Sequence, residues 1–394
     1  MFFEYEKEKP SLLENIKDLN GNLHIPKGLW RDTIDFYKKE EVLRKLKELI
    51  NNNEIKFPFR EYSFLEIQEE YQRLKTSSES FSKGTWECNR LVRQTDLLYK
   101  GQALYIPRTA RLGSRASDLF TQAVRMEVGH QRFLSPKRAW GSEKKAFLNY
   151  LFNPDMFEGD INDKALRTAL SMRSYVASQF KPESAKIVYD TFQAKNVLDF
   201  SAGWGDRLVG FLSSNAESYV GIDPNSKLHD PYEKIVEFCD EDKQVEFICS
   251  PAEDVDLGNK TFDFIFTSPP YFTLERYSQE DTQSWKRYPK ISLWLKKFLF
   301  PTLKNCWDHL EDGRLLVNIA DAYTNGTREE ICFPMLKYME SLGATYEGVL
   351  GYQMGGRPGA NMDNLGNVFC EPIWVWSKGN APEPKWQQDT FLGV

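Results

Sequence analysis

A short proline-containing motif carries the residues best suited to chemistry in this 394-residue chain. The motif reads Thr267-Ser268-Pro269-Pro270-Tyr271-Phe272 and directly follows an apolar, strand-like run. Two consecutive prolines restrict the backbone, so the Ser268 hydroxyl and the Pro269 carbonyl would be held in place as hydrogen-bond acceptors. Tyr271 adds a flat aromatic face for stacking. The motif could therefore hold a planar group that carries hydrogen-bond donors.

A glycine-containing turn is the second candidate site. Gly203 and Gly205 allow a tight turn and a close approach of the backbone to a ligand. Asp223 ends another strand-like run twenty residues beyond Gly203, where an acid can hold ribose hydroxyls. Leu208 stands where a dinucleotide fingerprint needs glycine, and the chain has no P-loop, which disfavours a dehydrogenase and an NTPase. The candidate cofactor-binding residues here are Asp199, Ser201, Ala202, Gly203, Gly205 and Asp223.

The elements that would position these residues alternate between strand and helix from about residue 161. This alternation predicts an α/β fold with a doubly wound, mainly parallel sheet of seven strands, the last two forming a hairpin-like pair. The expected strands are 197–200, 219–223, 245–249, 262–267, 313–319, 345–352 and 372–376. The expected helices are 162–180, 182–192, 207–213, 231–239, 293–310 and 329–342.

The preceding residues have a different pattern. Residues 1–165 predict a mainly helical N-terminal domain with long loops, followed by a catalytic domain over residues 166–394. Apolar residues at helical spacing predict helices over 40–51 and 64–75 and a third near 142–152.

The charge is unevenly distributed along the chain. The net charge of −6 hides a segment, residues 83–145, with 13 basic and 5 acidic side chains. Aromatic and amide residues are interleaved with these basic residues, a mixture that suits phosphate contacts and base stacking. A solvated basic surface without a partner is the alternative. The candidate nucleic-acid-binding residues are Arg108, Arg111, Arg115, Arg125, Arg132, Lys137 and Arg138, and Arg90 and Arg93 belong to the same segment.

The motif at Ser268 resembles the [Asp/Asn/Ser]-Pro-Pro-[Tyr/Phe] motif of DNA amino-methyltransferases, and the seven-stranded pattern resembles the Rossmann-like sheet of class I S-adenosylmethionine-dependent methyltransferases. Phe180-Lys181-Pro182 resembles the motif that precedes the cofactor loop in the gamma order of these enzymes. The resemblance covers roughly residues 165–394. It implies S-adenosylmethionine as cofactor, Ser268, Pro269, Pro270 and Tyr271 as catalytic residues, and the exocyclic amine of a flipped base in DNA as the methyl acceptor.

Two features depart from the family pattern. An acid often follows the third strand near the cofactor's adenine, but this chain has Pro251 there, and Glu253 is the expected substitute. The gamma order usually places a recognition domain after the catalytic motif, whereas here only a loop around 355–359 precedes the last strand. Recognition is therefore expected from residues 1–165, especially 83–145, helped by the loop 273–290, which is either a mobile lid or a substrate clamp.

The identity of the methylated amine stays open between alternatives. Serine at the first motif position resembles cytosine-N4 enzymes, whereas aspartate or asparagine is more usual in adenine-N6 enzymes, so cytosine N4 is favoured. An RNA substrate, a protein-glutamine substrate and a non-catalytic nucleic-acid-binding subunit of the same fold are further alternatives. A cytosine-C5 enzyme would need a Pro-Cys nucleophile, and the chain has no Pro-Cys pair.

The remaining expectations concern location and ligands. The N-terminus has no apolar signal-like region, and no apolar run is long enough for a membrane span, so a cytoplasmic protein without membrane contact is expected. Six scattered cysteines and four scattered histidines predict neither a disulfide framework nor a metal site. The oligomeric state is not predicted.

Overall fold

The computed structural model describes residues 11–14, 16–18, 21–88, 97–153, 157, 159–324, 326–355 and 368–386. The chain forms two compact units, each built from two stretches. The helical unit comprises Met1–Glu61 and Arg125–Ala177, and the sheet unit comprises Tyr62–Val124 and Ser178–Val394. This division differs from the predicted boundary between residues 165 and 166, because residues 62–124 fold with the sheet unit.

A buried carboxylate explains part of that difference. Glu183 is 2% exposed and accepts hydrogen bonds from the backbone N–H groups of Arg111 and Leu112, at 2.6 and 2.9 Å. Its other oxygen accepts from the Ser77 hydroxyl at 2.5 Å. A buried carboxylate needs such donors, so these contacts tie the segment 62–124 to the helix that carries Glu183. Residue pattern alone does not reveal contacts between segments so far apart in sequence.

The helical unit has its own apolar core, which includes Trp30, Leu46, Phe147 and Leu166. The predicted third helix is a 3-10 helix over Ala146–Phe152, which begins after Lys145 in the left-handed conformation (φ +41°). The helices of this unit are α1 (Lys27–Phe36), α2 (Lys39–Asn51), α5 (Pro136–Gly141) and α6 (Asp163–Ser171), and its short strands are β1 (His24–Ile25), β5 (Gly129–His130) and β6 (Ile161–Asn162).

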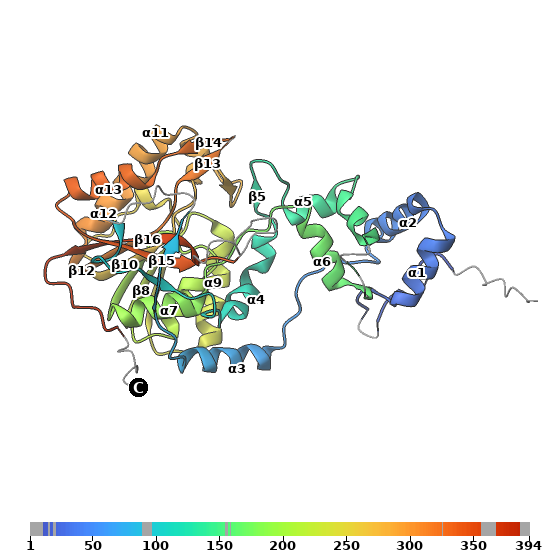
Figure 1. Ribbon diagram of the computed structural model, residues 1–394, viewed down its shortest axis with the longest axis horizontal. Coiled ribbons are helices and arrows are strands. Elements are labelled where there is room, and N and C mark those ends of the chain that lie inside the picture. The colour runs from blue at the N-terminus through green and yellow to red at the C-terminus, as the bar shows by residue number, and fades with distance from the viewer. Residues whose placement is uncertain are drawn as a thin grey trace, which may run out of the picture. The chain divides into compact units, whose positions relative to one another are not determined.

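The sheet unit contains a ten-stranded sheet (Figure 1). Its seven central strands follow the order β9-β8-β7-β10-β12-β16-β15. Six of them run in the same direction, and β16 runs in the opposite direction. The predicted α/β class and mainly parallel sheet are therefore confirmed. These strands are β7 (Asn196–Asp199), β8 (Ser218–Ile222), β9 (Gln244–Ile248), β10 (Phe262–Thr267), β12 (Leu310–Asn318), β15 (Thr345–Gln353) and β16 (Val368–Lys378).

Three further strands come from the segment that was predicted to be mainly helical. They are β2 (Ser82–Lys83), β3 (Trp86–Glu87) and β4 (Leu104–Ile106). β4 pairs with β15 in parallel, β2 pairs with β4, and β3 pairs with β16. The short strands β11 (Glu275–Arg276), β13 (Ala322–Thr324) and β14 (Thr327–Glu329) lie outside the large sheet.

Helices cover both faces of the large sheet, with α7 and α9 on one face and α12 and α13 on the other (Figure 1). No described helix combines the length and apolar character needed to cross a bilayer. The helices of this unit are α3 (Phe64–Lys75), α4 (Ser114–Arg125), α7 (Pro182–Thr191), α8 (Asp206–Leu212), α9 (His229–Cys239), α10 (Ser284–Arg287), α11 (Ile291–Trp294), α12 (Phe300–Asp308) and α13 (Cys332–Ser341).

Two predicted helices have different bounds. The helix expected over 162–180 ends at Ser171, where the Ser174 hydroxyl donates to the Leu170 carbonyl and the chain then becomes extended. The helix expected over 293–310 is interrupted by a π-helical turn, Leu295–Leu299, ahead of Pro301. Proline has no N–H to donate, which favours such an irregular turn.

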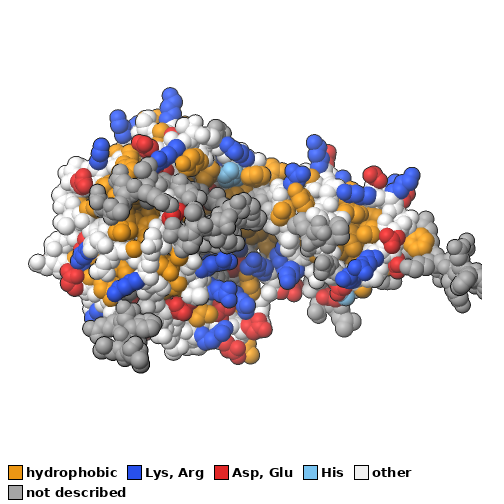
Figure 2. Space-filling view, in the orientation of Figure 1, with side chains coloured by type: hydrophobic (Ala, Val, Ile, Leu, Met, Phe, Trp, Pro, Cys, Tyr) orange, Lys and Arg blue, Asp and Glu red, His pale blue; other side chains and the backbone are white. Residues whose placement is uncertain are grey.

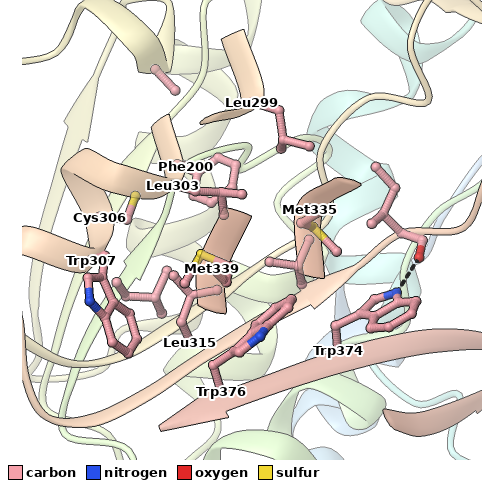
Figure 3. Packing of buried hydrophobic residues seen from close by; sticks show 14 of the residues in the cluster. Phe200, Leu299, Leu303, Cys306, Trp307, Leu315, Met335, Met339, Trp374 and Trp376 are labelled. Atoms are coloured by element: carbon pink, nitrogen blue, oxygen red, sulfur yellow. Dashed lines mark hydrogen bonds between the residues drawn. The ribbon is translucent and has the colours of Figure 1, made fainter. Parts of the chain in front are cut away.

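The core beside the site packs aromatic side chains against leucine, methionine and cysteine side chains (Figure 3). Trp374 and Trp376 of β16 are fully buried against α12 and α13, and the Trp374 indole donates to the Ile319 carbonyl at 3.0 Å. Phe200, in the glycine turn, belongs to the same cluster. The turn and the carboxyl end of β12 are therefore fixed by one continuous core.

Candidate cofactor and methyl-transfer site

The glycine turn between β7 and α8 requires glycine at its two key positions. Gly203 and Gly205 have φ values of +61° and +77°, which other residues rarely adopt. A Cβ on Gly205 would also lie 2.6 Å from the Cδ1 atom of Ile235. The Ala202 N–H donates to the Ile222 carbonyl at 3.0 Å, so the turn is attached to the end of β8. The predicted turn, including Ser201 and Ala202, lies at the carboxyl ends of the two strands.

Asp199 was predicted to accept a hydrogen bond from the cofactor, and the structure corrects this role. Its fully buried carboxylate accepts from the Arg207 Nε and Nη2 atoms at 2.7 and 3.2 Å. It also accepts from the Tyr219 hydroxyl at 3.0 Å and the Ser201 N–H at 3.2 Å. These four donors use the hydrogen-bonding capacity of the two oxygens. Asp199 therefore holds the turn in place.

Arg207 completes this buried arrangement. Its guanidinium also donates to the Ser201 carbonyl, so Arg207 contacts both Asp199, at the end of β7, and Ser201, in the turn. Burial opposes the charge of Arg207, but the neighbouring Asp199 carboxylate keeps the pKa of the guanidinium above its usual value. Sequence reasoning missed this role of Arg207, because a basic residue at the start of a helix usually faces solvent.

Asp223 lies where the sequence predicted it, next to the glycine turn. One carboxylate oxygen accepts from the Gly203 N–H at 3.0 Å, and the other accepts from the Asn225 N–H at 2.9 Å. Burial raises the pKa of Asp223 to about 6, although these two hydrogen bonds oppose the shift. Each oxygen keeps a lone pair that could accept from a hydroxyl of a ligand.

The residues Phe180, Lys181 and Pro182 lie at the start of α7. Lys181 is the N-cap residue, and Pro182 occupies the first turn, where its missing N–H costs nothing. The Phe180 ring stacks on Tyr352 of β15, with a centroid distance of 4.6 Å, and meets Phe266 of β10 edge-on at 5.6 Å. This segment thus packs beside the carboxyl end of β10, from which the proline motif emerges.

The proline motif continues directly from β10. The Ser268 hydroxyl donates to the Asn318 carbonyl at the end of β12, at 3.1 Å. β10 pairs with β7 on one side and with β12 on the other, so Ser268 and the glycine turn leave the sheet at the same edge. Tyr271 is 9% exposed and packs in the aromatic core, and Phe272 adopts a left-handed conformation (φ +54°). Ser268, Pro269, Pro270 and Tyr271 therefore form a rigid turn beside the glycine loop.

Glu253 follows β9 and is largely buried. Its Oε1 atom forms an ion pair with Arg287 at 2.6 Å, and Arg287 also pairs with Asp254 at 2.8 Å. Burial raises the pKa of Glu253, although Arg287 opposes the shift. The Oε2 atom of Glu253 has no hydrogen-bond partner among the described residues.

Two further buried groups in the loops around this site have an unpaired polar atom. The side-chain nitrogens of Asn225 and Gln283 lack hydrogen-bond partners within the part of the chain that the structure describes. An unpaired buried polar atom costs about 1–3 kcal/mol, so such atoms favour a polar ligand. One carboxylate oxygen and two amide N–H groups suit a ligand with an amino group and several acceptors. S-adenosylmethionine has both, and these residues fit it.

The predicted basic residues are divided between the two units. Arg108, Arg111 and Arg115 belong to the sheet unit, and Figure 2 shows Lys and Arg side chains gathered where α4 lies. Arg115 forms an ion pair with Glu70 at 3.3 Å. Arg108 and Arg111 are exposed and form no ion pair with any described residue. Arg90 and Arg93, like most of the loop at 355–359, lie outside the described residues.

The other basic residues belong to the helical unit, and one of them is misassigned. Arg125 is 5% exposed and donates to the Ala177 carbonyl at 3.1 Å, so it is not available to a phosphate. Lys137 lies over the Phe57 and Phe59 rings, at 5.1 and 4.8 Å from their centroids. Arg132 and Arg138 are exposed. Basic character along the sequence does not distinguish these environments.

Comparison with protein-family models and with curated proteins finds no match. Similar solved structures include TrmN from Thermus thermophilus, with 15% identity over 51% of this chain and 49% of that chain, at a TM-score of 0.35. TehB from Haemophilus influenzae matches with 10% identity over 52% and 64% of the two chains, at a TM-score of 0.33. An rRNA methylase from Streptococcus thermophilus matches with 14% identity over 51% and 99%, at a TM-score of 0.31.

The match thus spans about half the length of TrmN. Because all three TM-scores lie below 0.5, the class of the fold rests on the sheet itself. The central order β9-β8-β7-β10-β12-β16-β15, with β16 reversed between β12 and β15, agrees with the seven-stranded, mainly parallel sheet and final hairpin-like pair that the sequence predicted. The chain is an α/β protein with a mainly parallel, Rossmann-like sheet.

Proposed function

We propose that the chain is an S-adenosylmethionine-dependent amino-methyltransferase that acts on the exocyclic amine of a base in DNA, with cytosine N4 favoured over adenine N6. The hydrogen bond from Ser268 to the Asn318 carbonyl carries this proposal. It uses the single hydrogen of the hydroxyl, so both lone pairs of the Ser268 oxygen remain available as acceptors. An amino group presents the donors that such an acceptor needs.

The residues of the motif supply what a conjugated amine requires. Its nitrogen lone pair is delocalised into the ring, so the amine is a poor nucleophile. Acceptors at Ser268 Oγ and the Pro269 carbonyl would hold the amino hydrogens and stabilise the positive charge that develops on nitrogen. The two prolines keep both acceptors in place before the base arrives, and Tyr271 would stack on it. The new N–C bond would form as the S–C bond breaks, S-adenosylhomocysteine would leave as the neutral thioether, and the proton lost from the nitrogen would pass to solvent.

The bound S-adenosylmethionine would supply a methyl group on a sulfonium, which is already a strong electrophile. Asp223 would hold its ribose hydroxyls, and the turn at Gly203 and Gly205 would contact its amino-acid part. Glu253 has the unpaired oxygen that an adenine amine needs. Asp199 would not contact the cofactor itself and would act as a positioning residue, because it holds the turn through the Ser201 N–H.

The exposed basic residues support DNA as the partner, since Arg108, Arg111, Arg132 and Arg138 could neutralise phosphates. Transfer of labelled methyl groups to duplex DNA, single-stranded DNA, RNA and bulk protein tests the substrate class. Label in a DNA sample supports the proposal. Label confined to RNA or protein would overturn the DNA assignment, and no label in any sample would favour a non-catalytic subunit.

A further inference from the structure

Residues 273–290, here called the strap, contact the loops at the carboxyl ends of three neighbouring strands. Tyr277 packs on Trp204 of the glycine turn, with a centroid distance of 5.7 Å. Glu280 contacts Ser226 after β8, and Arg287 forms the ion pair with Glu253 after β9. These are the three loops that carry the candidate cofactor residues. The strap is therefore attached to these loops from Tyr277 to Arg287.

The attachment after β8 is the most extensive. The Glu280 carboxylate accepts from the Ser226 N–H at 3.3 and 3.2 Å and from the Ser226 hydroxyl. The Thr282 hydroxyl donates to the Pro224 carbonyl at 3.2 Å. Ser278 holds Glu280 in position by donating to its carboxylate and accepting from its N–H, both at 3.1 Å. These contacts fall on the residues directly before and after Asn225.

Asn225 and Gln283 lie next in sequence to residues that form this attachment. Gln283 directly follows Thr282, and Asn225 directly follows Pro224, whose carbonyl accepts from the Thr282 hydroxyl. They are 1% and 5% exposed, and each has a side-chain nitrogen without a partner among the described residues. The Asn225 Oδ1 atom accepts from the Lys227 N–H at 3.3 Å, which leaves its NH₂ group for a ligand. Two buried donors without described partners, each next in sequence to the attachment, indicate acceptors on a bound molecule.

We propose that the strap forms the outer wall of the cofactor site, that Gln283 and Asn225 donate to acceptors of bound S-adenosylmethionine, and that Glu280 must release Ser226 before the cofactor leaves. This inference rests on the function proposed above. The strap begins directly after Phe272, so the chain that forms the methyl-transfer motif continues into the cover of the cofactor.

The test uses binding of S-adenosylhomocysteine and S-adenosylmethionine to the full chain, measured by calorimetry and by stopped-flow dissociation. Gln283→Leu should weaken affinity at least about tenfold, because one buried donor is lost at similar side-chain size. Glu280→Gln should speed dissociation by a similar factor. Glu246→Gln is the matched control, because Glu246 is likewise a carboxylate held by a polar partner, in an exposed ion pair with Lys260 that lies outside the strap. It should leave both quantities unchanged.

Hydrogen exchange adds a readout that needs no ligand. In the ligand-free protein, the backbone amides of 282–288 should exchange faster in Glu280→Gln than in the wild type, and bound cofactor should slow exchange in the wild type. If the wild type binds but both strap variants keep its affinity and dissociation rate, the strap proposal is overturned and the proposed function stands. If the wild type binds neither compound, the proposed function itself fails.

Discussion

The Ser268 hydroxyl donates its only hydrogen to the Asn318 carbonyl, at 3.1 Å, where β10 and β12 end side by side. Asn318 is itself fixed, since its side-chain amide donates to the Pro372 carbonyl at 3.1 Å. The Asn318 carbonyl can only accept a hydrogen bond, so it takes the hydroxyl hydrogen of Ser268. The Ser268 oxygen is then left to act as an acceptor toward a ligand. This relationship explains why a residue with both a donor and an acceptor suits the first position of the motif in this chain.

Substitutions at Ser268 should separate the need for a donor toward the Asn318 carbonyl from the need for an acceptor toward the substrate amine. Ser268→Asp offers only acceptors and would face the Asn318 carbonyl, so methyl transfer should fall at least about a hundredfold. Ser268→Asn can both donate and accept and should keep more activity than Ser268→Asp. Rates of labelled methyl transfer measure both. Ser218→Ala removes a hydroxyl at the opposite end of the sheet and should have no effect. Equal rates for the Asp and Asn variants would contradict this role of Asn318.

Tyr271→Ala should abolish transfer while leaving cofactor affinity within about twofold of the wild type, because the ring is assigned to the base. Tyr271 also packs in the core, so the free energy of unfolding must be measured alongside. Tyr271→Phe keeps the packing and the stacking face and should retain most activity. A variant Tyr271→Phe as inactive as Tyr271→Ala would show that the hydroxyl, and not the ring face, is required.

Cofactor affinity should depend on the ionisation of Asp223. Burial raises the pKa of this carboxyl to about 6, so it becomes protonated as the pH falls through that value. The protonated form has lost acceptor capacity toward ribose hydroxyls, and affinity should therefore decrease below about pH 6. Calorimetry between about pH 5 and 8 measures this, on the scale of 1.4 kcal/mol per pKa unit. Asp223→Asn should bind weakly and lose the pH dependence, and an unchanged affinity in this variant would contradict the ribose role.

Replacement of Asp199 should lower the stability of the folded protein. Asp199→Ala leaves the Arg207 guanidinium buried without its partner, which should lower the free energy of unfolding by about 3–5 kcal/mol. Denaturant unfolding measures the loss. The exposed ion pair of Lys234 with Asp230 is the control, and Asp230→Ala should change stability by less than about 1 kcal/mol. Normal stability with lost cofactor affinity in Asp199→Ala would indicate the direct contact that the sequence suggested.

The basic residues should differ in their effect on DNA affinity. With four exposed arginines available, the logarithm of the binding constant should fall with the logarithm of salt concentration at a slope of about −3 to −4. Arg132→Ala or Arg138→Ala should each reduce that slope by about 1. Arg125→Ala should instead lower stability, because Arg125 is buried. A salt-independent binding constant would contradict phosphate contacts.

The sequence predicted those features that depend on local pattern. Apolar runs predicted the seven central strands, and the sequence placed the Gly203 turn, Asp223 and Ser268 at the ends of three of them, where the structure also has them. The sequence could not show that Arg207 occupies the Asp199 carboxylate or that Arg125 is buried, because both depend on contacts across the fold. Nor did Asn225 and Gln283 stand out, since polar residues in loops usually face solvent.

The most direct test of the central claim is nucleoside mass spectrometry of DNA incubated with the chain and S-adenosylmethionine. We expect a methylated exocyclic amine, with N4-methylcytosine favoured over N6-methyladenine, in DNA treated with the wild type and none above background with Ser268→Asp. Absence of both methylated bases after incubation with a wild-type protein that binds S-adenosylmethionine would contradict this claim.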